Sequence, residues 1–258
     1  MPQIIAMAAS LGYDGIELRF VQGEDSLWKL PVFQGKELSS TTQTLADCGL
    51  TISCLDTSCR FHSPNAKERQ QWIEEGERMS DLAAALRAPG MRVFGDTIQP
   101  GAERDTTRTW IADGISRLSE TTSSKGVEVW IESHGDFASA PESLAILSQA
   151  GSPQAGVLWD PANCLIEAQE SPDEGAAKLG TAIRHTHIKD LKKDNGAWNH
   201  VLTGDGNVPL RQLLDALRRL NYDRFLSFEW EKKWHPEIPD AEVALPHFVN
   251  WFRRELSS

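Results

Sequence analysis

Short apolar runs that end in polar residues recur along the chain and predict buried β-strands. The runs are rich in Val, Ile, Leu and Phe, as is typical of strands that are covered on both faces. Each apolar stretch is short enough to favour a strand over a helix. Seven such runs occur, at residues 15–19, 51–58, 91–96, 127–136, 155–163, 184–190 and 225–231.

Helix-like stretches separate these runs. One begins with Ser63 as the expected N-cap and Pro64 in the first turn, and it ends before Gly90. Another, at residues 209–222, places its leucines on one helical stripe. Strand and helix alternate as in right-handed βα units, so we expect a parallel sheet. With this many units and no Rossmann glycine fingerprint after an early strand, the pattern favours an α/β barrel of the (β/α)8 TIM-barrel type.

One strand of such a barrel is missing from the pattern. The chain starts with a helix-like stretch at residues 2–12, and nothing before it could form a first strand. Residues 1–258 contain no linker or composition break, so we expect a single barrel domain that is N-terminally truncated. The strands at 15–19 and 225–231 would then face each other across a gap.

Composition and charge limit the partners. The chain is 24% charged and 40% hydrophobic, which is ordinary for a soluble globular protein. Its net charge of −11, without any basic run, argues against nucleic acid. No apolar run is long enough for a membrane span, the N-terminus lacks a signal-peptide pattern, and the four cysteines have no CxxC spacing. We expect a cytoplasmic protein that binds a small molecule, and the sequence leaves assembly into a homo-oligomer open.

The last four strands end in residues that could bind a metal ion. In a βα barrel the C-terminal strand ends supply the active site, so the last inward-facing residues should converge. Three carboxylates crowded into a dry pocket repel one another unless a cation is present. Carboxylates with one imidazole suit Mn²⁺, Mg²⁺, Co²⁺ or Zn²⁺. The four predicted residues are Glu132, Asp160, His187 and Glu229.

Five segments resemble a known family. They are GYDGIEL at 12–18, IESHGDF at 131–137, LWDPANC at 158–164, HTHIKD at 185–190 and LSFEWEKKWHPEI at 226–238. In this order they resemble the sugar phosphate isomerase/epimerase family, which belongs to the xylose-isomerase-like barrel superfamily together with the family 2 AP endonucleases. The resemblance runs over nearly the whole chain.

The resemblance implies a metal-dependent proton transfer. It implies that Glu132, Asp160, His187 and Glu229 hold one divalent ion, with Mn²⁺ the first expectation. It also implies that Glu132 and Glu229 are the catalytic acid and base, which move a proton through a metal-stabilised enediolate. We therefore expect an isomerase or epimerase of a sugar, ketose or sugar-acid substrate.

Further residues are predicted to bind substrate, although each could instead serve a structural role or lie on a solvated rim. His134 could bind a hydroxyl group, and Arg19 and Lys189 could meet a phosphate or a carboxylate. Asn163 stands where many epimerases of this superfamily carry a histidine, and it cannot take up a proton at neutral pH. The backbone amides of the turn at 203–210 could bind an anion.

Two other functions remain open. The same metal and base could expel a β-hydroxyl as water, which would make the protein a dehydratase. The missing strand would also be compatible with a non-catalytic sugar-binding barrel. A hydrolytic nuclease is disfavoured, because the chain has only seven histidines and a negative charge.

Overall fold

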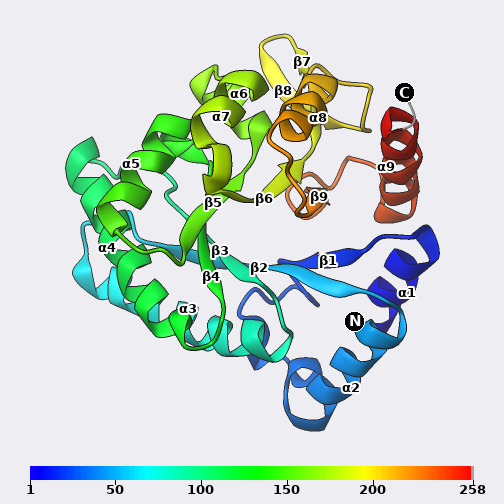
Figure 1. Cartoon of the computed structure of the whole chain (residues 1–258), viewed down its shortest axis with the longest axis horizontal. Coiled ribbons are helices and arrows are strands. Elements are labelled where there is room, and N and C mark those ends of the chain that lie inside the picture. Colours follow the sequence, from blue (N-terminus) through cyan, green and yellow to red (C-terminus); the bar gives the residue numbers. More distant parts are fainter. Residues whose placement is uncertain (257–258) are drawn as a thin grey trace.

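A parallel sheet of seven strands forms the centre of the computed structural model, which describes residues 1–256 (Figure 1). The sheet order is β1-β2-β3-β4-β5-β6-β9, and every neighbouring pair is parallel. This is a nearly closed barrel of the TIM-barrel type, so the predicted fold class and the seven strands are confirmed. The strands are β1 (Gly15–Leu18), β2 (Thr51–Arg60), β3 (Gly90–Phe94), β4 (Glu128–Glu132), β5 (Ala155–Trp159), β6 (Ile183–Ile188) and β9 (Leu226–Phe228).

Helices cover the outside of the sheet (Figure 1). In residues 1–256 no helix is both long and apolar enough to cross a membrane. The α-helices are α1 (Pro2–Leu11), α2 (Gly35–Asp47), α3 (Ala66–Ala85), α4 (Arg104–Ser123), α5 (Ala140–Ala150), α6 (Pro161–Ala168), α7 (Pro172–Leu179), α8 (Leu210–Arg219) and α9 (Ala241–Leu256). The 3-10 helices are η1 (Leu27–Lys29), η2 (Pro31–Phe33), η3 (Gly135–Phe137) and η4 (Gly180–Ala182).

The N-terminus of α3 lies slightly beyond the predicted position. Asn65 is the N-cap, because its side chain accepts a hydrogen bond from the amide of Lys67 at 2.9 Å. The predicted cap, Ser63, instead accepts from the amide of Asn65 at 3.1 Å. The prediction missed that a second capping residue follows Ser63 and Pro64.

The sheet is open between β1 and β9, which do not pair with each other within the described residues. Helices α1 and α9 lie side by side outside this gap (Figure 1). The hydroxyl of Tyr13, just after α1, donates to the carbonyl of Leu245 in α9 at 3.1 Å, and its ring stacks on Phe248. The predicted gap is therefore present, and two packed helices cover its outer side.

A β-hairpin after β6 was not predicted. Strands β7 (Asp190–Asp194) and β8 (Ala197–Val201) form a separate antiparallel pair. Asn195 and Gly196 connect them, and both have positive φ, at 48° and 87°. An Asn-Gly pair is the strongest short-range hairpin signal, so the sequence did contain the information.

Candidate active site and metal centre

Four side chains from neighbouring strands converge at the C-terminal end of the sheet. Glu132 is the last residue of β4, Asp160 follows β5, His187 is the penultimate residue of β6, and Glu229 follows β9. One potential ligand atom of each lies within 4.8 Å of the others. Nδ1 of His187 is 3.7 Å from oxygens of both Glu132 and Asp160, and 3.5 Å from Glu229. The structure thus brings together the four predicted residues, here called the four-residue cluster.

Local structure fixes the position of Asp160. It is the N-cap of α6, and its Oδ1 accepts from the amide of Asn163 at 2.9 Å. Its own amide donates to the hydroxyl of Ser133 at 2.7 Å. With Oδ1 and the backbone held, Oδ2 is left to face the centre of the cluster, where it lies 3.7 Å from Nδ1 of His187.

One buried atom of the cluster, Nδ1 of His187, has no hydrogen bond, and its nearest carboxylate oxygens lie 3.5 to 3.7 Å away. Buried polar atoms are ordinarily paired, so a buried nitrogen left unpaired among carboxylates indicates a missing partner. The other ring nitrogen of His187, Nε2, lies 3.0 Å from Oε1 of Glu17. A carboxylate there favours the proton on Nε2, so Nδ1 is the nitrogen through which the ring can bind a cation. Three carboxylates and one imidazole nitrogen fit a divalent ion such as Mn²⁺, Mg²⁺, Co²⁺ or Zn²⁺.

Glu17 is a neighbour of the cluster that the sequence analysis missed. It lies in β1 and contacts Nε2 of both His185, at 2.9 Å, and His187, at 3.0 Å. Burial opposes ionisation of Glu17, but the two imidazoles hold its pKa well below the usual range. His185 is buried beside His187, as expected of a hydrogen-bonded core histidine. The signal for Glu17 was a carboxylate inside an otherwise apolar strand.

Arg92 was also missed, and it holds Glu132 in place. Its buried guanidinium donates to Oε2 of Glu132 at 2.5 Å and lies 3.6 Å from Asp56. Burial by itself would raise the pKa of Glu132, but Arg92 and His187 together outweigh it and the pKa falls to about 2. Glu132 is therefore ionised at neutral pH, with one oxygen on Arg92 and the other toward His187.

Lys189 lies among carboxylates. Its buried ammonium is 2.9 Å from Oδ2 of Asp160 and 2.8 Å from an oxygen of each of Glu229 and Glu231. Burial raises the pKa of Asp160, but Lys189 and then His187 outweigh it and bring the value to about 2. The structure therefore directs Lys189 to the chain's own carboxylates, and its contact with a substrate anion stays a prediction.

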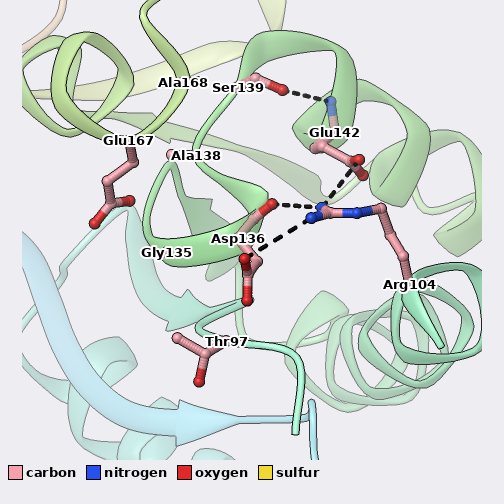
Figure 2. A pocket seen from close by; sticks show the side chains of 9 residues that line it. All are labelled: Thr97, Arg104, Gly135, Asp136, Ala138, Ser139, Glu142, Glu167 and Ala168. Carbon is pink, nitrogen blue, oxygen red and sulfur yellow. Dashed lines mark hydrogen bonds and ion pairs between the residues drawn. The ribbon is translucent and has the colours of Figure 1, made fainter. Parts of the chain in front are cut away.

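A cavity of about 480 Å³ lies near the same end of the barrel (Figure 2). Figure 2 shows Arg104 directed toward Asp136 and Glu142, and its Nη1 donates to the Asp136 carbonyl at 2.6 Å and to Glu142 at 3.3 Å. No member of the four-residue cluster lines this cavity, and the cation that lines it, Arg104, is already paired with carboxylates.

A second cavity, about 380 Å³, adjoins the cluster and is here called the central cavity. Asn163 donates to the carbonyl of Ser133 at 3.2 Å and to Glu132 at 3.4 Å. The ring of His134 meets Phe94 edge-on at 5.2 Å. All four residues predicted to bind substrate line the central cavity, as do both predicted catalytic glutamates: Arg19, His134, Asn163, Lys189, Glu132 and Glu229.

Comparison with known proteins places the chain in a family. Residues 5–254 match the family described as the xylose isomerase-like TIM barrel. The chain belongs to this family. A curated relative is the fructoselysine 3-epimerase of Escherichia coli O157:H7, which is 23% identical over 231 residues; the match covers 86% of this chain and 82% of that protein.

Solved structures share the fold of this chain. An L-ribulose 3-epimerase superposes with a TM-score of 0.81 at 17% identity, covering 99% of this chain and 88% of the other. The probable 3-DHS dehydratase AsbF of Bacillus anthracis gives a TM-score of 0.79 at 17% identity, covering 98% and 93%. At these identities the likeness establishes the fold.

One predicted anion site of this xylose isomerase-like barrel is occupied by the chain itself. The carboxylate of Asp190 accepts from the amides of Gly204 at 2.8 Å, Gly206 at 2.9 Å and Val208 at 3.3 Å. These amides belong to the turn at 203–210. The expectation that they bind an external anion is wrong, because an internal carboxylate uses them.

Proposed function

We propose that this chain is a divalent-metal-dependent isomerase or epimerase of a sugar, ketose or sugar acid. The observation that carries the proposal is the convergence of Glu132, Asp160 and Glu229 on the unpaired Nδ1 of His187. The named relatives, which include sugar epimerases, support a reaction of this class.

The four-residue cluster would hold the ion, and the central cavity would hold the substrate beside it. A bound divalent ion polarises a carbonyl group and so makes the neighbouring C–H bond more acidic. Glu132 and Glu229 both line the cavity, so each can reach a substrate placed there. One of them removes the proton next to the carbonyl, and the other returns a proton to the adjacent position or to the opposite face.

Neighbouring residues prepare the two glutamates. Arg92 keeps Glu132 ionised and directs one of its oxygens away from the cluster. Lys189 donates to Glu229 and also contacts Asp160 and Glu231, and so fixes the position of Glu229. Asn163 adds an amide donor beside Glu132. Together these contacts fix both glutamates before substrate arrives, which favours catalysis by positioning.

Metal binding is the first test. Protein purified without chelators and re-equilibrated with Mn²⁺ should retain about one ion per chain by elemental analysis. The Asp160→Asn variant should lose it, while Glu237→Gln, on an exposed side chain in the loop after β9, should not. A wild-type protein without bound metal would contradict the proposal.

Proton transfer is the second test. In D₂O, the metal-loaded protein should incorporate deuterium into a ketose substrate without change in its carbon skeleton. Glu229→Gln should slow this exchange by about 100-fold or more, because it removes the proton-transfer group. Loss of water from the substrate would indicate a dehydratase instead. Sugar binding without exchange would indicate a non-catalytic binding barrel.

A further inference from the structure

One cation of the central cavity has no carboxylate partner. Four cationic side chains line the cavity: Arg19, Arg60, Arg92 and Lys189. Each of the four carboxylates that line it pairs with one of the last three cations. The pairs are Asp96 with Arg60 at 2.8 Å, Glu132 with Arg92 at 2.5 Å, and Glu229 and Glu231 with Lys189 at 2.8 Å each. Among the described residues, no carboxylate oxygen lies within 4.0 Å of a guanidinium nitrogen of Arg19.

The guanidinium of Arg19 is held in place but mostly unpaired. Its Nη2 donates to the hydroxyl of Ser58 at 2.7 Å, and that hydroxyl donates to Asp25 at 2.6 Å. Its Nη1 is buried and has no hydrogen-bond partner. A guanidinium has five N–H donors, so Arg19 has donors to spare. Burial and the nearby Arg92 lower its pKa to about 10, and it therefore stays cationic at neutral pH.

A second unpaired cation lies close to Arg19. The guanidinium carbon of Arg19 lies 4.2 Å from the ring centre of Phe20, and the ammonium of Lys233 lies 3.0 Å from the same centre. Lys233 is exposed and has no ion pair among residues 1–256. Two cations without a carboxylate within 4.0 Å therefore lie against one ring, beside the cavity that Arg19 lines.

Asp56, Asp25 and Glu132 attract Arg19 only from beyond 4.0 Å, so its partly desolvated guanidinium would gain from the direct contact of an anionic ligand. The planar fork of an arginine matches the oxygens of a carboxylate or a phosphate. Lys189 is less suited than Arg19 to bind an anionic ligand, because its ammonium already contacts three carboxylates. Arg60 is held by Asp96.

We propose that Arg19 is the anion subsite of the central cavity and that the substrate is an acidic sugar. Its carboxylate or phosphate group binds Arg19, and its carbonyl end lies at the four-residue cluster. That the substrate's carbonyl end lies at the four-residue cluster rests on the proposed function, whereas the contact of the anionic group with Arg19 concerns binding alone.

Isothermal titration of the Mn²⁺-loaded protein tests the subsite with three ketoses. D-fructose is neutral, 5-keto-D-gluconate carries a carboxylate, and D-fructose 6-phosphate carries a phosphate. At least one acidic ketose should bind about 10- to 100-fold more tightly than D-fructose, and the better of the two identifies the anionic group.

The variants separate charge from shape. Arg19→Gln keeps a polar side chain beside Ser58 but removes the charge, and it should bring the ratio of acidic to neutral affinity close to one. Arg19→Lys keeps the charge and should retain part of the preference for acidic over neutral ketoses. Arg218→Met, on the surface of α8, should behave as wild type.

The outcomes distinguish the subsite from the reaction. Equal affinity for neutral and acidic ketoses, an equal loss for both in Arg19→Gln, or no binding of either acidic ketose at about 10 mM would overturn the subsite. An acid preference that depends on Arg19, without any deuterium exchange, would leave the subsite standing and contradict only the proposed reaction. Deuterium exchange on a neutral ketose, without any preference for acidic ketoses, would contradict the subsite and leave the proposed reaction standing.

Discussion

At the scale of single residues, Glu17 determines which nitrogen of His187 faces the cluster. Its carboxylate lies on Nε2 of both His185 and His187, so Nδ1 of His187 is the nitrogen left toward the three carboxylates. A group that orients a ligand in this way raises metal affinity without touching the metal.

The Glu17→Gln substitution should therefore weaken Mn²⁺ binding by about 10- to 100-fold, measured by titration calorimetry. A neutral amide has only one accepting oxygen for the two imidazoles, so it favours the proton on Nε2 of His187 less strongly and the correct tautomer is less populated. His185→Gln is the matched control, because it removes the other partner of Glu17 and leaves the contact with His187. A larger loss in the control than in Glu17→Gln would contradict this role.

Glu132 should make the metal-free protein sensitive to acid. Its pKa of about 2 lies below its ordinary value of 4.5, because Arg92 and His187 together outweigh the effect of burial. The contribution of this ionised carboxylate to the unfolding free energy is thus complete above pH 4.5 and is lost as the pH falls toward 2. The shift corresponds to about 3 kcal/mol of unfolding free energy. The difference in unfolding free energy between wild type and Glu132→Gln, from urea titrations at about pH 6 and about pH 2, should shrink by that amount. A difference independent of pH would contradict the assignment.

At the scale of elements, the link between β6 and α8 depends on one buried carboxylate. Asp190, the first residue of β7, accepts from the amides of Gly204, Gly206 and Val208 and so fixes the turn before α8. The turn follows the hairpin that carries His200, which lines the central cavity.

Asp190→Asn should destabilise the protein by about 1–3 kcal/mol, because an amide cannot accept all three hydrogen bonds. Thermal unfolding would show the loss, and hydrogen exchange should accelerate at residues 204–208. The control is Asp205→Asn, in the same turn but exposed, which should change little. Equal effects of the two variants would show that the turn does not depend on Asp190.

The strand ends could be predicted from the sequence, but contacts across the barrel could not. Glu132, Asp160 and Glu229 each end or follow an apolar run, His187 lies next to the end of its strand, and parallel strands bring such positions to one edge. Glu17 lies within a strand, where the pairing register shifts between Ile16 and Glu17. A shift of this kind changes which side chains face inward, and an apolar pattern does not reveal it.

At the scale of the whole molecule, the gap between β1 and β9 leaves β1 paired on one side only within residues 1–256. The packed helices α1 and α9 join the two sides outside the sheet. Inside it, Glu17 of β1 contacts His185 and His187 of β6, which pairs with β9. Strands on opposite sides of the gap are therefore tied by the same side chains that orient the candidate ligand.

Local opening of β1 and occupancy of the cluster are for this reason linked equilibria. A cation that binds only when His187 is correctly oriented also selects the state in which β1 is closed, and linkage makes the effect reciprocal. Adding Mn²⁺ should slow amide exchange in β1, although that strand supplies no ligand, and Glu17→Gln at saturating Mn²⁺ should not show this protection. Any change that leaves β1 open for part of the time would weaken metal binding, because the apparent dissociation constant rises as the closed fraction falls. The gap in the sheet would thus influence the range of ion concentrations over which the cluster is occupied.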